Sequence, residues 1–171
     1  MVWRLFLKKN EVLNQVRFLP ANPAEGLPED VFLLVSRLTP MINVDLLIKD
    51  REGRTLLTWR DDGYCKPGWH IPGGIIRYKE SISDRIKKTA LNEIGTEVKF
   101  IKKPLEIKEF VHPLRKNRGH FISLLYRCFL VGAMDRGRMF KSGRPKSGEL
   151  AWHDKCPVNL LSVHEVYRRH I

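Results

Sequence analysis

The sequence predicts a single mixed α/β domain, and three observations lead to this prediction. The chain has 171 residues, of which 43% are hydrophobic, and this suits one domain around one buried core. Apolar residues recur every four positions over residues 81–94, which is the spacing of an amphipathic helix. Apolar stretches typical of β-strands lie on both sides of that helix. Helices and strands are therefore expected to share one core.

The first elements are expected between residues 27 and 60, after an N-terminal lead-in of residues 1–26. Leu27-Pro28-Glu29-Asp30 is typical of a helix start, with a proline in the first turn and acids near the positive end of the helix dipole. Residues 42–49 and 54–59 then flank a turn signal and predict a β-hairpin. Asp45 lies inside the first of these strands, where a carboxylate is costly without a partner, so we favour a functional role for it.

A glycine turn and a central helix follow. Ile82, Ile86, Ala90 and Ile94 would form the buried stripe of a helix over residues 81–94. Further strands are expected at residues 105–112, 120–132 and 149–154, and a C-terminal helix at residues 158–171. Residues 27–171 thus form the one predicted domain.

The net charge of the chain is +12, which favours anionic partners. The basic residues fall in scattered groups, without the aromatic-rich basic face on which bases stack, so nucleic acid is a disfavoured partner. Residues 136–146 are rich in both basic residues and glycine, and they predict a mobile basic loop.

The cysteines and the apolar stretches indicate the compartment. Cys65, Cys128 and Cys156 are odd in number and have no C-x-x-C spacing, so neither a disulfide framework nor a zinc knot is indicated. No apolar stretch approaches the length of a membrane span. We expect a cytoplasmic protein with no membrane partner.

Residues 72–98 resemble the Nudix box, the signature of the Nudix hydrolases. In that signature a glycine and a glutamate at a fixed spacing precede a helix that carries Arg-Glu and Glu-Glu pairs and ends at a glycine. The matching positions are Gly74, Glu80, Glu93 and Gly95. The departures are Lys88 for arginine, Thr89 and Asn92 for two glutamates, and Thr96 for an aliphatic residue.

The resemblance implies a Nudix-type mixed sheet sandwiched between helices, and a divalent metal. Residues 89, 92 and 93 share one helical face, on which the family presents carboxylates to the metal. Glu93 is the one acid left on that face, which suits one Mg²⁺ ion, with Mn²⁺ as an alternative. Glu80 is read equally as a structural acid at the helix start and as a ligand. Lys88 would lack the bidentate fork of arginine.

The sequence resembles one branch of the family, the GDP-mannose mannosyl hydrolases, in which the box lacks the same two acids. The stretches at residues 28–48 and 69–74 also resemble that branch. The resemblance implies a nucleoside-diphosphate sugar as substrate, similar to GDP-mannose. Water would attack the sugar carbon and release nucleoside diphosphate and free sugar.

Site residues follow from the same resemblance. The Gly73 carbonyl and Glu93 would hold the metal, Arg60 would contact the diphosphate, and Asp45 would contact the sugar or nucleoside end. His112 would lie near the site. Ile75 replaces a basic residue of that branch, and Arg77 is the candidate to substitute for it.

The general base is the largest departure. Lys146 and Ser147 occupy the slot in which that branch has a Gln-His pair. His112, His120 and His153 are alternative bases because a neutral imidazole titrates near the working pH. Glu149, at the end of the basic loop, is another catalytic candidate.

Two other functions stay open. One is attack at phosphorus of a nucleotide or nucleotide sugar, the ordinary Nudix pyrophosphohydrolase reaction. The other is a non-catalytic domain that binds nucleotides or RNA, because a fold can be retained after its catalytic acids are lost. The oligomeric state is also open, with a homodimer as one alternative.

Overall fold

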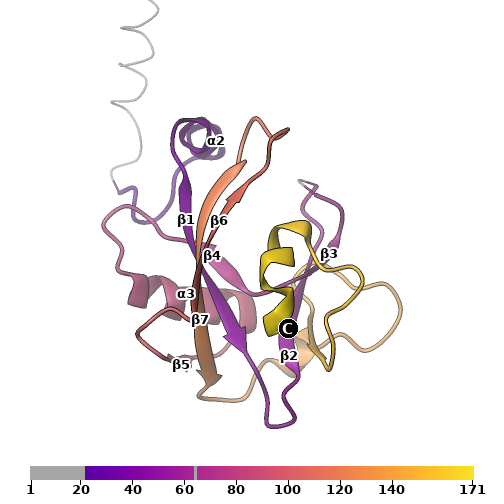
Figure 1. Cartoon of the computed structure of the whole chain (residues 1–171). Coiled ribbons are helices and arrows are strands. Elements are labelled where there is room, and N and C mark those ends of the chain that lie inside the picture. The colour runs from indigo at the N-terminus through magenta and orange to yellow at the C-terminus, as the bar shows by residue number, and fades with distance from the viewer. Residues whose placement is uncertain (1–21, 64) are drawn as a thin grey trace, which may run out of the picture.

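The computed structural model describes residues 22–63 and 65–171, and it contains two β-sheets with helices packed around them (Figure 1). Most of the predicted lead-in, residues 1–21, lies outside the described residues. The strands are β1 (Met41–Ile48), β2 (Thr55–Arg60), β3 (Gly68–His70), β4 (Gly73–Ile75), β5 (Val98–Phe100), β6 (Glu106–Val111), β7 (His120–Leu130) and β8 (Leu150–His153). The helices are α2 (Glu29–Leu38), α3 (Ile82–Ile94), and the 3₁₀ segments η1 (Arg136–Arg138) and η2 (Ser162–His170).

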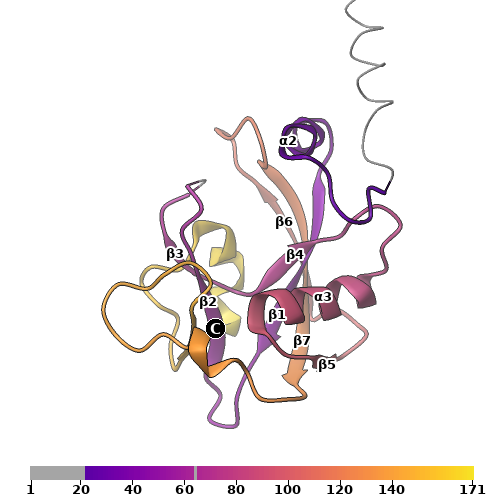
Figure 2. The same cartoon turned by 180° about the vertical axis from the view of Figure 1, so that it is seen from behind.

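The larger sheet is mixed, which confirms the predicted α/β class. Its strand order is β4-β1-β7-β5, and β6 also pairs with β7. β1 and β7 run parallel, whereas β4 lies antiparallel to β1 at the edge of the sheet and places Gly73 opposite Asp45. α3 packs against β1 and β4, as seen from the helix side in Figure 2. The smaller sheet has the order β3-β2-β8.

Helix α3 begins and ends where the sequence predicts. The Ser81 hydroxyl caps its first turn by accepting a hydrogen bond from the Asp84 N–H, and Gly95 ends it in the left-handed conformation at φ 79°. Ile86 and Ile94 are fully buried, but Ile82 is 40% exposed. The buried stripe therefore starts one turn later than predicted.

The predicted hairpin of residues 42–49 and 54–59 is wrong, although its turn is correct. β1 and β2 belong to different sheets and share only the isolated bridge between Lys49 and Thr55. Beyond that bridge, β1 pairs with β4 and β7, and β2 pairs with β3 and β8. Each strand pairs with other strands of its own sheet, so the turn joins two sheets.

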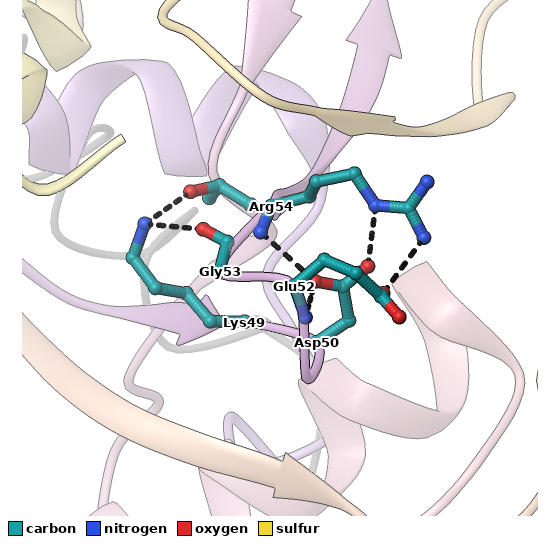
Figure 3. Close-up of polar contacts among 6 residues, drawn as sticks. Lys49, Asp50, Glu52, Gly53 and Arg54 are labelled. Carbon is teal, nitrogen blue, oxygen red and sulfur yellow. Dashed lines mark hydrogen bonds and ion pairs between the residues drawn. The ribbon is translucent and has the colours of Figure 1, made fainter.

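The turn itself is held by side chains (Figure 3). Asp50 Oδ1 accepts a hydrogen bond from the Arg54 N–H at 2.9 Å, and Asp50 Oδ2 pairs with Arg54 Nε at 2.6 Å. Lys49 Nζ donates to the Gly53 carbonyl at 3.1 Å and to Thr55 Oγ1 at 2.8 Å. Gly53 has a φ of 83°, which explains a glycine at this position.

The late elements also follow the prediction, with one difference. β6, β7 and β8 form in the three predicted strand regions, but the C-terminal helix is the 3₁₀ segment η2. η2 buries His164 and Tyr167, and its end is tied to β6 because His170 Nε2 lies 2.7 Å from Glu106 Oε2. All three cysteines are free, and the described part of the chain has no helix that is long and apolar enough to cross a membrane.

Candidate active site

An open cleft of about 1000 Å³ is lined by residues of both sheets, α2, α3 and η2. It brings together most of the residues that the sequence suggested for metal and substrate. The predicted residues that line it are Asp45, Arg60, Gly73, Gly74, Arg77 and Glu93.

Glu93 lies in the last turn of α3 and its side chain is 36% exposed. Burial raises the pKa of this carboxyl, while the positive charges of Arg60 and Arg138 oppose the rise. His70 Nε2 lies 4.0 Å from its Oε2. Thr89 and Asn92, which replace acids of the box, line the same cleft.

Gly73 lines the same cleft and could supply a second oxygen through its main-chain carbonyl. The Leu46 N–H donates to the Pro72 carbonyl at 2.8 Å, which fixes the register of β4 against β1. Because carbonyls alternate along an antiparallel strand, the Gly73 carbonyl points away from β1, toward the open edge of the sheet. A Cβ at residue 73 would overlap the Asp45 carboxylate, so the close approach requires glycine.

These oxygens fit a divalent cation. Mg²⁺ binds through one or two protein oxygens when water and substrate phosphate complete its octahedron. A carboxylate and a free main-chain carbonyl in one cleft are hard donors of this kind. Gly73 and Glu93 could therefore hold one ion.

Glu80 lies at the start of α3, outside the cleft lining, and protein groups contact both oxygens of its carboxylate. Its Oε2 accepts hydrogen bonds from Arg77 N–H at 3.0 Å and Arg85 Nε at 2.7 Å, and Lys88 Nζ lies 3.1 Å from Oε1. Burial opposes ionisation, but these bonds outweigh it and lower the pKa of Glu80. The expected loss of the fork at residue 88 is thus compensated, because Arg85 also brings Nη2 to 2.6 Å from Glu80.

The other predicted catalytic residues lie outside the cleft lining. His112 is in an exposed turn, where its Nδ1 accepts a hydrogen bond from the Leu114 N–H at 3.3 Å. Glu149 Oε2 accepts from the Lys146 N–H at 2.8 Å and so closes its own loop. Ser147, in the slot that lacks a histidine, does line the cleft.

The two alternative histidines are also engaged elsewhere. His120 lies 3.0 Å from Glu109 at the exposed end of the β6–β7 pair. His153 packs edge-on against Trp69 with ring centroids 4.7 Å apart, and burial lowers its pKa.

Two histidines that the sequence reading overlooked do line the cleft, His70 and His164. Burial, reinforced by the charges of His164 and Arg60, lowers the pKa of His70 well below its usual value. His164 is buried on η2 and accepts a hydrogen bond from the Ile71 N–H at its Nδ1, at 2.8 Å. One signal in the sequence was available: His164 lies three residues before Tyr167, and thus on the apolar face of the last helix.

Asp45 forms the floor of the cleft with these residues. Its Oδ2 accepts a short hydrogen bond from the Ser123 hydroxyl, and the Tyr167 hydroxyl lies 2.7 Å from Ser123 Oγ. Burial raises the pKa of Asp45, and His164, Ser123, Asn43 and Arg60 oppose the rise in that order.

Arginines give the cleft its charge. Arg60 lines it from the end of β2 and pairs with Asp62 at 2.7 Å, while Arg77 places its guanidinium beside Gly26. Arg138 comes from the predicted mobile loop, but it donates to the Asn92 carbonyl at 3.0 Å and to the Gly148 carbonyl at 3.2 Å. Arg115 and Arg118 also line the cleft. Such a cleft suits an anionic ligand.

Comparisons with known proteins give the same family as the box. The family model for the NUDIX domain matches residues 39–167. A curated relative is the low-salt glycan biosynthesis protein Agl8 of Haloferax volcanii, 30% identical over 76 residues; the match covers 44% of this chain and about half, 48%, of the relative.

Solved structures share the fold. One is described as a diadenosine tetraphosphate hydrolase from Jonesia denitrificans, with a TM-score of 0.60, 17% identity, and 78% of this chain and 92% of that chain covered. Another is the MutT NUDIX hydrolase of Burkholderia pseudomallei, with a TM-score of 0.53, 19% identity, and coverage of 78% and 98%. The cleft beside a NUDIX box, the matching domain model and the shared fold lead to one conclusion: the chain belongs to the NUDIX hydrolase family.

Proposed function

We propose that the protein hydrolyses a nucleoside-diphosphate sugar similar to GDP-mannose, with Mg²⁺, and releases nucleoside diphosphate and free sugar. One observation carries the proposal. The box helix α3 presents a single carboxylate, Glu93, to an arginine-lined cleft, while Thr89 and Asn92 occupy the neighbouring positions of the same face.

The diphosphate would bind at this basic side of the cleft. Gly73 and Glu93 would hold one Mg²⁺, which supplies positive charge to the diphosphate leaving group. Arg60 and Arg138 line the cleft near Glu93, and their charges act on its carboxyl. They would bind the remaining phosphate oxygens, because guanidinium groups match phosphate geometry.

The sugar would then lie toward Asp45, on the floor of the cleft. Attack at phosphorus profits from a pair of metals that hold both the attacking and the leaving oxygens. Attack at a sugar carbon needs instead a stabilised leaving group, which Arg60 and Arg138 are placed to provide. The low number of acids on α3 therefore favours attack at carbon.

The curated relative supports a sugar substrate in a limited way. The protein from Haloferax volcanii is named for glycan biosynthesis, and glycan assembly consumes activated sugars. Because the match covers less than half of this chain, the activity of that protein enters here only as support for the substrate class.

Hydrolysis in ¹⁸O-labelled water tests the proposal. Purified protein is incubated with GDP-mannose and related nucleotide sugars, with Mg²⁺ and with a chelator. Mg²⁺-dependent release of nucleoside diphosphate and ¹⁸O-labelled free sugar is expected. Nucleoside monophosphate with sugar phosphate, and label in phosphate, would show attack at phosphorus instead. Ligand binding without turnover of any nucleotide or nucleotide sugar would indicate a binding domain.

A further inference from the structure

Two buried polar groups face each other on the floor of the cleft without a direct hydrogen bond. Asp45 Oδ1 and His164 Nε2 are 3.9 Å apart, which is longer than a hydrogen bond between such atoms. Asp45 is 2% exposed and His164 is 8% exposed, yet both line the cleft. No hydrogen bond from the described residues reaches either of these two atoms, so both are available to a ligand in the cleft.

The tautomer of His164 is set by the main chain. The Ile71 N–H donates to Nδ1 of His164 at 2.8 Å, so Nδ1 is the unprotonated nitrogen of the neutral ring. Burial lowers the pKa of His164, although the charge of Asp45 opposes the shift, and this favours the neutral form. Nε2 therefore carries the proton and acts as a donor toward the cleft.

The orientation of Asp45 is set by a hydrogen-bond chain. The Tyr167 hydroxyl donates to Ser123 Oγ at 2.7 Å, so the Ser123 proton is directed to Asp45 Oδ2. Asn43 Nδ2 lies 3.5 Å from the same Ser123 Oγ. These contacts hold the carboxylate while Oδ1 faces His164 as an acceptor.

The 3.9 Å between donor and acceptor is too short for an oxygen atom on the line that joins them, but an oxygen to one side can reach both. An oxygen at an ordinary distance of about 2.8 Å from both atoms would make contacts that subtend about 90°. A hydroxyl group can use both contacts at once, because it donates one hydrogen bond and accepts another.

We propose that Asp45 and His164 together bind one hydroxyl group of the substrate sugar, which donates to Asp45 Oδ1 and accepts from His164 Nε2. This inference rests on the proposed function for the identity of the ligand, and it adds a specificity residue, His164, from the far C-terminal end of the chain. A sugar that lacks this hydroxyl would leave a buried donor and a buried acceptor unpaired, and such sites discriminate strongly.

Two substitutions of His164 separate this role from a structural one. In His164→Asn the amide oxygen lies close to the former Nδ1 and still accepts the Ile71 N–H, but the donor toward Asp45 is lost. In His164→Gln the amide NH₂ group reaches closer to the former Nε2 and restores part of the donor. Glu165→Gln is the matched control, because Glu165 lies on the same 3₁₀ segment, outside the cleft lining, and pairs with Arg168.

Binding is measured by calorimetry with a chelator in place of Mg²⁺, so that the proposed hydrolysis does not consume the ligand. The ligands are the nucleotide sugar, a set of its monodeoxy analogues, and the nucleoside diphosphate alone. Wild-type protein should bind one analogue about tenfold more weakly than the parent sugar nucleotide, as expected for one lost hydrogen bond. His164→Asn should bind the parent about tenfold more weakly, with no further loss for that analogue. His164→Gln should lose less, and Glu165→Gln should match the wild type. Thermal unfolding of each variant reports whether the fold is kept.

Other results would overturn the hydroxyl site. One is a His164→Asn protein that discriminates among the analogues as the wild type does, and another is wild-type protein that binds all analogues, or the nucleoside diphosphate alone, as tightly as the parent. The proposed reaction fails separately, if the wild type shows hydroxyl-dependent binding but releases no free sugar.

Discussion

The two ends of helix α3 each carry a glutamate of the NUDIX box, and the two carboxylates differ in exposure and in hydrogen bonding. Glu80, before the first turn, is 3% exposed, and its carboxylate is engaged by the Arg77 N–H, Arg85 and Lys88. Glu93, in the last turn, is 36% exposed, and no hydrogen bond reaches its carboxylate from the described residues. Hydrogen bonding lowers the pKa of Glu80 against the effect of burial, whereas burial raises the pKa of Glu93.

This difference shows how one residue type takes two roles in one motif. A carboxylate that accepts hydrogen bonds from protein donors stabilises the turn that leads into the helix. It then has few acceptor sites free for a ligand. A partly buried carboxylate with empty lone pairs is destabilised by burial until a cation or a positive ligand group arrives. The comparison therefore predicts a structural role for Glu80 and ligand binding for Glu93, and four substitutions test these predictions.

Glu93→Gln should have the largest effect. The amide keeps the shape of the side chain but removes the charge, so Mg²⁺-dependent turnover should fall at least about a hundredfold, because metal charge at a leaving group is worth several kcal/mol. The fold should be kept, because the carboxylate has no protein partner to lose. Steady-state kinetics and thermal unfolding measure both. Glu97→Gln, exposed just beyond the helix, is the control. Full activity in Glu93→Gln would remove Glu93 from the metal site.

Glu80→Gln should show the reverse pattern. The substitution leaves Arg85, which is 6% exposed, without its counter-charge, and breaking such a buried pair should cost about 2–3 kcal/mol of the free energy of unfolding. Turnover per folded molecule should change little. Urea unfolding and kinetics below the unfolding transition provide the two measurements. A large loss of turnover with unchanged stability would reverse the roles of the two acids.

The sequence predicts the metal end of the cleft better than its floor. Glu93, Gly73 and Gly74 lie in one local motif, and a helix of known period places them without any knowledge of the tertiary structure. The same local reasoning missed Arg85, which lies one turn before Lys88 on the helix and reaches the same carboxylate.

The floor of the cleft depends on contacts between distant residues. Asp45 meets Ser123 because β1 and β7 pair in parallel, and it meets His164 because η2 packs beside them. No local pattern in the sequence shows that these distant residues contact Asp45. The hairpin error has the same origin, since the turn at Asp50 is local but the partners of β1 and β2 are not. Long-range pairing therefore limits what one sequence predicts about the substrate end of the site.

Glu106 extends the comparison to a third engaged acid. Lys108, with His170 and Arg169, lowers the pKa of Glu106 to about 2, although burial opposes the shift. Because the folded-state pKa lies below the usual 4.5, the stabilisation is complete above that pH and is lost as the pH falls toward 2. Glu106→Gln should cost about 1 kcal/mol of unfolding free energy near neutral pH, and the difference from wild type should shrink at about pH 3. Urea unfolding at both pH values measures this. A difference that does not change with pH would show that the charge of Glu106 contributes nothing.

Asn92→Glu should have the smallest effect and most directly sharpens the contrast between the two ends of the helix. Asn92 lines the cleft next to Glu93 on an exposed part of α3, so a carboxylate fits there without burial. Arg138 donates a hydrogen bond to the main-chain carbonyl of Asn92, and the substitution keeps this group. A second carboxylate on the face of Glu93 should tighten Mg²⁺ binding about threefold to tenfold, because affinity for hard cations rises with ligand charge. Calorimetric titration of Mg²⁺ into wild type and variant measures the change, and Asn92→Gln controls for side-chain length. Tighter binding in Asn92→Glu alone would show that the cleft end of α3 accepts a metal and is limited by its number of acids. Equal binding in all three proteins would place the cation away from this face and leave both ends of the helix structural.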